Sequence, residues 1–300
     1  MMVERVRERL GRFGVWIPPY VLGVTSVEVQ RRELVRIERL GYGSIWTGET
    51  PVASSMRSRE AFAQLGLMLA ATERIVVGAG IANIGNRAAT AMHTGAATLA
   101  EAYPGRFVLG LGGHSGERPL GMLREYLDAM ARPADTANQL ADYPLVLAAL
   151  GPRAHELARE RAHGVHPFLQ PVAHTAAARA AVGPGSLVIP HQSVVLETDP
   201  DTARSRLRAI FDAGVGAAHS PYARHYLRLG YSEADVLGRR SDRLIDDLLA
   251  WGDEAAVAAR LTAQLDAGAD HVLVHPFAAD LPAAVDQLER LAPLLVGAAY

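Results

Sequence analysis

Short apolar runs alternate with longer amphipathic segments along this chain, and that alternation limits the possible fold more than any other feature. Eight apolar runs have the length of a strand, and a segment with helical spacing, rich in Ala, Leu and Arg, follows each of them. Parallel strands need such crossover helices, and eight strand–helix pairs predict an α/β fold closed into a TIM (β/α)8 barrel. The predicted strands are 13–18, 44–47, 75–81, 107–112, 145–149, 164–167, 187–196 and 271–275.

One long segment does not follow the alternation. Residues 213–251, between the seventh and eighth predicted strands, are weakly periodic and hold three tyrosines and two histidines. We interpret this segment as an insertion that covers one end of the barrel. No linker or change in composition marks a domain boundary, so residues 1–300 are expected to form a single domain.

The composition excludes several classes of chemistry. The chain has no cysteine, which excludes disulfides, thiolate metal sites and cysteine nucleophiles. All 30 basic residues are arginine, which excludes a Schiff-base lysine and a Walker-type phosphate loop. A net charge of −2 gives no general attraction to nucleic acid or to an anionic membrane. The charged N-terminus and the lack of an 18-residue apolar run predict a cytoplasmic protein.

In a TIM barrel the chemistry takes place at the carboxyl ends of the strands, so the loops that follow the predicted strands matter most. The loop 110–117 reads Gly-Leu-Gly-Gly-His-Ser-Gly-Glu. Ser115 breaks the dinucleotide fingerprint, and Glu117 stands where a nucleophile elbow needs glycine. We favour a glycine-rich loop that lets a flat or phosphorylated ligand approach the backbone; a tight strand-to-helix turn is the alternative.

Two further segments indicate backbone contact with a ligand. Gly78 and Gly80 weaken the third predicted strand, which suits either a bulge or the close approach of a ligand. Gly151 and Pro152 begin a helix after the fifth strand, and the free N–H groups there suit a phosphate as well as an ordinary helix start.

Candidate acid–base residues lie at the same end of the barrel. The repeated tetrapeptide Val-His-Pro-Phe places His166 and His275 at two strand ends, where each is either a proton donor or acceptor or a packed core histidine. Glu49 follows the second strand and is either a base or a structural carboxylate. In the insertion, His219 and Tyr222 are candidate pocket residues. No spacing of ligands indicates a metal site.

The segment 97–112 reads Ala-Thr-Leu-Ala-Glu-Ala-Tyr-Pro-Gly-Arg-Phe-Val-Leu-Gly-Leu-Gly. Together with 41–49, 75–87 and 150–158, it resembles the luciferase-like monooxygenase superfamily, within it the coenzyme F-420-dependent oxidoreductases. The resemblance covers nearly the whole chain. It implies a non-prolyl cis peptide at Gly80–Ile81, hydride transfer between the deazaflavin F-420 and a small organic substrate, and a homodimer.

The resemblance, with the loops described above, gives a set of expected site residues. The expected cofactor-binding residues are Trp46, Glu49, Gly80, Ile81, Ala82, Asn83, Gly112, Gly113, Ser115, Leu150, Gly151 and Pro152. The expected substrate-binding residues are Trp16, Tyr20, Thr50, His166, His219 and Tyr222, and the expected catalytic residues are Glu49 and His114.

Two departures from the family pattern bear on the activity. Many relatives have histidine where this chain has Thr50, which makes His114 the expected replacement acid. The absence of lysine disfavours a sugar-phosphate dehydrogenase. Three alternatives stay open: an FMN-dependent monooxygenase, a serine hydrolase that uses Ser115 with His271 or His275, and a protein that binds a flavin-like ligand without catalysis.

Overall fold

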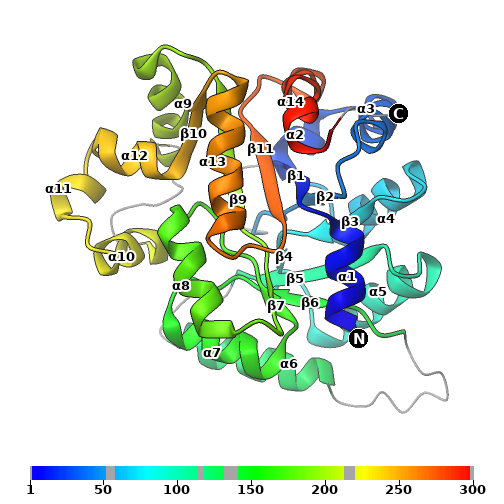
Figure 1. Ribbon diagram of the computed structural model, residues 1–300. Coiled ribbons are helices and arrows are strands. Elements are labelled where there is room, and N and C mark those ends of the chain that lie inside the picture. Colours follow the sequence, from blue (N-terminus) through cyan, green and yellow to red (C-terminus); the bar gives the residue numbers. More distant parts are fainter. Residues whose placement is uncertain (1, 52–57, 114–117, 132–140, 213–219, 298–300) are drawn as a thin grey trace.

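The strands form a closed parallel barrel, as the sequence predicts (Figure 1). The computed structural model describes residues 2–51, 58–113, 118–131, 141–212 and 220–297. Apart from β10, which pairs only with β9 while β9 pairs directly with β11, the strands follow one another around the barrel in chain order, and every pairing between them is parallel. They are β1 (Phe13–Ile17), β2 (Ser44–Thr47), β3 (Val76–Ala79), β4 (Ala82–Asn83), β5 (Phe107–Gly112), β6 (Leu145–Leu147), β7 (Gly164–Val165), β8 (Leu187–Val188), β9 (His191–Leu196), β10 (Leu249–Gly252) and β11 (Val272–Pro276).

The ring closes through the segment that carries β8 and β9. Pro190 interrupts this segment, which the sequence indicates as one strand, because proline has no N–H to give to a neighbour. The segment still bonds to both sides: Ile189 N–H donates to Val165 O, and Leu273 N–H donates to Pro190 O, both at 2.9 Å. The strands therefore connect from β1 through to β11, which pairs with β1 again.

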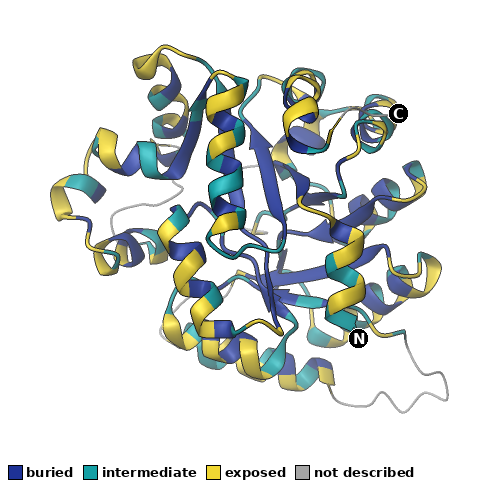
Figure 2. Cartoon of the chain, in the orientation of Figure 1, coloured by how far each residue is buried: buried dark blue, intermediate teal, exposed yellow. Residues whose placement is uncertain are grey.

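Successive strand residues enter two different cores. Trp16, Trp46, Val76, Val108 and Leu273 point into the barrel, and their chain neighbours pack outward under the helices. Both faces of the strands are thus buried, which explains continuous apolar runs in place of a two-residue alternation. Figure 2 shows the resulting pattern: buried strands inside, and helices with exposed outer faces.

The helices begin where the sequence offers a cap. Ser26, Asp253 and Asp280 each accept a hydrogen bond from a backbone N–H in the first turn of the helix that follows. The helices are α1 (Met2–Leu10), α2 (Pro19–Val24), α3 (Val27–Arg39), α4 (Ala61–Ala71), α5 (Ala89–Ala102), α6 (Pro119–Ala131), α7 (Pro152–Arg161), α8 (Val172–Val182), α9 (Pro200–Asp212), α10 (Pro221–Arg228), α11 (Glu233–Val236), α12 (Asp242–Leu248), α13 (Glu254–Asp266) and α14 (Leu281–Leu295). None of the described helices is long and apolar enough to cross a membrane.

The insertion has more regular structure than its sequence indicates. Within 213–251 the structure places α10, α11, α12 and most of β10, a strand that pairs in parallel with the outer half of β9. Helix α9, which precedes this segment, packs against β10 and α12. These elements share a second hydrophobic core, which includes Leu207, Phe211, Tyr226 and Ile245. They project to one side of the barrel (Figure 1).

Candidate functional site

The carboxyl end of β3 bends sharply at the barrel mouth. The peptide bond between Gly80 and Ile81 is cis, which confirms what the resemblance implies. Trp16 Nε1 donates to Gly80 O at 2.8 Å, and Glu49 N–H donates to Ile81 O at 3.0 Å. Both carbonyls of this bend are therefore held from neighbouring strand ends, which fixes the backbone facing the mouth.

Glu49 has a clear structural role beside this bend. Its Oε2 accepts from Asn83 N–H at 3.0 Å and from Arg87 Nη1 at 2.9 Å, and its Oε1 contacts Arg87 Nη2. The side chains of Glu49 and Arg87 are only 5% and 11% exposed. Burial alone would lower the pKa of Arg87, but the hydrogen bond and charge of Glu49 outweigh it and raise that pKa. The ion pair ties the segment after β2 to the loop after β4.

Gly113, at the described end of the glycine-rich segment, packs on Asn83. Gly113 has φ of +82°, and a β-carbon there would lie 2.2 Å from Asn83 Oδ1. Asn83 Oδ1 itself accepts from Gly85 N–H at 2.9 Å. Glycine at position 113 is thus required by a tight turn over a neighbouring loop. His114 and Ser115, which the sequence indicates as a proton donor and a cofactor contact, lie outside the described residues, as does His219.

A cavity of about 460 Å³ and another of about 570 Å³ lie at this end of the barrel. The larger one, here called the mouth cavity, brings together Gly113, Leu150, Gly151 and Pro152, all expected cofactor contacts, with His166 and Tyr222, expected substrate contacts. It is also lined by three arginines that sequence reasoning missed: Arg153, Arg224 and Arg228.

The arginines cluster where helix α7 begins. Gly151 is the N-cap residue of α7 and Pro152 opens the helix, so no side chain caps this end. The Nη2 atom of Arg228 lies 3.3 Å from where a β-carbon on Gly151 would be. A helix N-terminus and three guanidinium groups attract an anion such as a phosphate. The four-residue spacing of Arg224 and Arg228 was the available signal, because it places both on the same face of a helix, although the sequence analysis predicted no helix there.

His166 lines the mouth cavity and has an unpartnered hydrogen-bond acceptor. Its Nδ1 lies 2.7 Å from Ile189 O, which can only accept, so Nδ1 carries the proton and Nε2 carries a lone pair. Nε2 is buried and has no partner among the described residues. Burial lowers the pKa of His166 to about 4, so the ring is neutral at neutral pH. A buried lone pair of this kind favours a ligand with an N–H or O–H donor.

Four other expected site residues, Trp46, Ala82, Gly112 and Thr50, lie outside both cavities. Trp46 is completely buried below His166, donates to Ser44 Oγ at 2.8 Å and lines neither cavity. Ala82 and Gly112 are buried in the paired strands β4 and β5. Thr50 Oγ1 lies 2.8 Å from Ser58 Oγ.

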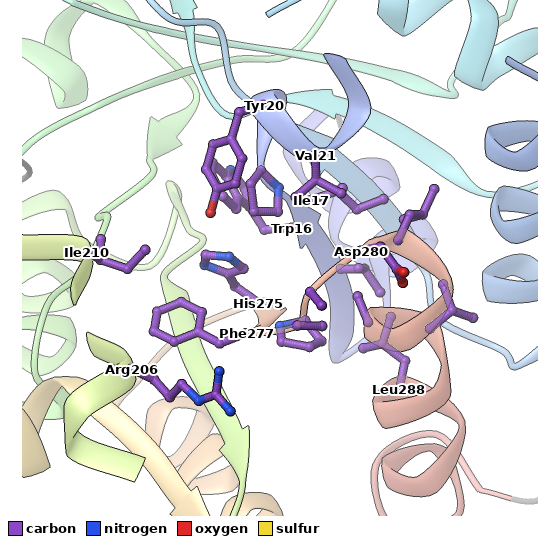
Figure 3. Close-up of a pocket in the computed structure, with 18 of the residues that line it drawn as sticks. Trp16, Ile17, Tyr20, Val21, Arg206, Ile210, His275, Phe277, Asp280 and Leu288 are labelled. Atoms are coloured by element: carbon purple, nitrogen blue, oxygen red, sulfur yellow. The ribbon is translucent and has the colours of Figure 1, made fainter. Parts of the chain in front are cut away.

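Trp16 and Tyr20, expected substrate contacts, line the smaller cavity, here called the side cavity (Figure 3). It lies between the ends of β1 and β11 and helices α2, α9 and α14. Four rings separate it from the mouth cavity: Trp16 packs edge-on to Phe168, Phe168 stacks on His191 at 3.9 Å, and His191 contacts His275. The expected substrate residues are thus divided between two cavities.

The sequence profile of the luciferase-like monooxygenase family matches residues 12–271. The chain belongs to this family. A search among curated proteins finds no sequence match. Among solved structures, this luciferase-like protein is similar to an F420-dependent secondary alcohol dehydrogenase in complex with an F420-acetone adduct, at 16% identity and a TM-score of 0.70, over 95% of this chain and 99% of that chain.

Two other structures are equally similar to this luciferase-like protein. The coenzyme F420-dependent tetrahydromethanopterin reductase of Methanopyrus kandleri has 17% identity and a TM-score of 0.70, over 95% of this chain and 99% of that chain. The oxygenating constituent of 3,6-diketocamphane monooxygenase of Pseudomonas putida, in complex with FMN, has 13% identity and a TM-score of 0.70, over 95% and 98%. At these identities the likeness concerns the fold.

Proposed function

We propose that this protein is an oxidoreductase that transfers a hydride between coenzyme F-420 and a small organic substrate. One observation carries the proposal: the mouth cavity is lined both by His166, whose Nε2 is a buried, unpartnered acceptor, and by an arginine-rich helix N-terminus. A planar ring with an N–H group suits the first end, and a phosphate suits the second. The motifs of residues 97–112 and the two F420-dependent structures support the choice of F-420.

The residues present fit such a cofactor. The bend at Gly80–Ile81 has no side chain on its first residue, and His166, which lines the mouth cavity, packs beside it. Leu150, Gly151 and Pro152 would hold the phosphate with Arg228, and His166 would accept a hydrogen bond from the ring. When bound, the deazaflavin supplies the hydride chemistry, and the protein supplies orientation and exclusion of water.

An FMN-dependent monooxygenase is the second candidate. The structure in complex with FMN is as similar to this chain, with a TM-score of 0.70, as the F420-dependent ones are. FMN also combines a flat ring with a phosphate, so the mouth cavity suits either molecule.

Titration of the purified protein with F-420 and, in parallel, with FMN decides between the candidates, with ligand fluorescence as the signal. We expect F-420 to bind with a dissociation constant in the micromolar range or below, and FMN to bind more weakly. Tighter binding of FMN would favour the monooxygenase. Binding of neither molecule would overturn both candidates.

A further inference from the structure

Three buried histidines lie together next to the arginine-rich start of helix α7. They come from three helices: His155 from α7, His174 from α8 and His225 from α10. The ring centroids of His155 and His174 are 5.4 Å apart, and those of His174 and His225 are 4.8 Å apart. None of the three residues is more than 4% exposed. The cluster therefore joins the insertion, which holds α10, to two helices of the barrel.

A chain of hydrogen bonds connects this cluster to Arg228, which lines the mouth cavity. Arg228 Nη2 lies 3.0 Å from His225 Nδ1, and His225 Nε2 lies 3.0 Å from His174 Nδ1. A guanidinium can only donate, so His225 Nδ1 is the acceptor and the proton of that ring is on Nε2. His225 Nε2 therefore donates to His174 Nδ1. Both hydrogen bonds thus have a fixed direction, set by the arginine.

The ring that holds the arginine is neutral. Burial, and secondarily the positive charge of Arg228, lower the pKa of His225 to about 4, so its Nδ1 lone pair is available at neutral pH. A neutral partner leaves the charge of the guanidinium uncompensated, and Arg228 forms no ion pair among the residues that the structure describes. A guanidinium that is oriented but not neutralised favours an anion as its next partner.

The hydrogen bond to His225 keeps the guanidinium at the start of α7. Arg228 Nη2 is 3.3 Å from where a β-carbon on Gly151, the N-cap residue of α7, would lie. Arg228 is otherwise an exposed side chain, and an exposed arginine samples many rotamers. Binding an anion costs less conformational entropy when the side chain is already held in place. The cluster therefore prepares this end of the mouth cavity for an anion.

We propose that His225 and His174 are positioning residues: His225 holds Arg228 ready to bind a phosphate group at the start of α7, and His174 keeps His225 in the tautomer that can do so. Neither histidine lines the mouth cavity, so both act through the arginine. The inference rests on the proposed function for one element only, the phosphate site of the mouth cavity.

The test uses the protein without any cofactor, with inorganic phosphate as the probe. Isothermal titration calorimetry at neutral pH and constant ionic strength measures the dissociation constant. We expect the wild type to bind phosphate in the millimolar range. His225→Phe, which keeps a ring but has no acceptor, should bind it at least about threefold more weakly. Unchanged affinity in His225→Phe, or no binding of phosphate by the wild type, would overturn the proposal.

Two amide variants separate positioning from packing. In His225→Asn the new Oδ1 takes the place of Nδ1 and can accept from Arg228, whereas in His225→Gln the longer side chain reaches the place of Nε2 and leaves no acceptor for the arginine. We expect His225→Asn to stay within about twofold of the wild-type affinity for phosphate and His225→Gln to lose at least about threefold. Equal losses would indicate a general loss of packing and overturn the positioning role. This pair also decides the question if His225→Phe does not fold.

A double variant shows whether His225 acts through Arg228. When Arg228→Met is already present, His225→Gln should change the affinity for phosphate by less than about 1.5-fold, because no guanidinium is left to position. A full threefold loss in that background would contradict the role.

His174 has a matched pair of its own. His174→Phe removes the acceptor for His225 Nε2, so the proton of His225 is free to move to Nδ1, and phosphate should bind at least about twofold more weakly. In His174→Asn the new Oδ1 still accepts from His225, and the affinity should stay close to that of the wild type. Equal affinities in the two variants would overturn the role of His174.

These results are separate from the cofactor titration. If phosphate binding follows this pattern and neither F-420 nor FMN binds, the proposed function fails and the positioning role stands. If F-420 binds and His225→Gln keeps the wild-type affinity for phosphate, the positioning role fails and the proposed function stands.

Discussion

Gly80 lies where the end of β3 turns toward the barrel mouth, and a β-carbon there would be 3.0 Å from both His166 Nε2 and Trp16 Nε1. We expect Gly80→Val to weaken cofactor binding at least tenfold, because its side chain would displace Trp16 and His166, and His166 is the proposed hydrogen-bond acceptor for the ring. Fluorescence titration with F-420 and FMN measures the effect. Gly185→Val is the control, since nothing lies within 4 Å of a β-carbon there. Unchanged affinity in Gly80→Val would refute the role of His166 beside this bend.

Glu49 offers a second prediction at the level of one side chain. Glu49→Gln keeps the shape but leaves the guanidinium of Arg87 with only the exposed Glu60 carboxylate as ionic partner among the described residues. We expect the free energy of unfolding, measured in urea, to fall by about 3–5 kcal/mol, since removing one partner of a buried ion pair leaves the other charge buried. Glu160→Gln breaks a pair whose side chains are 41% and 50% exposed and should cost less than about 0.5 kcal/mol. Equal losses in the two variants would contradict the anchoring role.

At this scale the sequence predicts residues next to each other in the chain better than distant partners. Leu150, Gly151 and Pro152 are adjacent and line one cavity, as expected. The pair Glu49–Arg87 joins residues from different loops, and no local pattern indicates it. The roles proposed for Glu49 and His114 in catalysis stay predictions.

Helices α7 and α10 both line the mouth cavity, where Arg228 of α10 lies close to Gly151 at the start of α7. A substitution of Arg228 therefore tests whether the two helices form a phosphate site together. We expect Arg228→Met to weaken FMN binding at least fivefold but riboflavin binding less than twofold, because the two ligands differ by the phosphate. Added salt should reduce the difference between wild type and variant. Arg159→Met, near the other end of α7, is the control and should change neither affinity. Equal weakening of both ligands would contradict a phosphate site.

There are physical reasons why sequence analysis did not predict strand β10 and helix α1. β10 follows α12 directly, without a turn residue between Leu248 and Leu249, so the apolar pattern of the helix continues into the strand. α1 is strongly charged, and we noted its charge without recognising its apolar stripe, although Leu10 is completely buried at the base of the barrel. The eight barrel positions were predictable because each strand is buried on both faces and bounded by a helix.

For the whole molecule, the burial of many histidines makes the stability of the fold sensitive to acid. Eight described histidines have a pKa lowered mainly by burial: His155, His163, His166, His174, His191, His225, His271 and His275. In the unfolded chain each titrates near its ordinary value, so the unfolded state binds more protons below pH 6.5. Stability is therefore complete above that pH and is lost as the pH falls toward 4.

This dependence can be measured as the free energy of unfolding in urea at pH 7 and pH 5. His166, with a folded pKa of about 4, should by itself account for a loss of about 2 kcal/mol between these two values. His166→Phe should therefore lose less stability than the wild type over the same interval. The same loss in both proteins would contradict a neutral, buried His166.

The pairing of β10 with β9 has a further consequence for how such a protein can diversify. The crossover between these strands starts and ends at neighbouring positions, since Leu196 pairs with Gly252. Its side chains pack largely among themselves, in a core separate from that of the barrel. A segment with adjacent ends and its own core can be exchanged as a unit while the barrel keeps its closure. In terms of descent, the barrel and the residues between Leu196 and Gly252 are free to change at different rates.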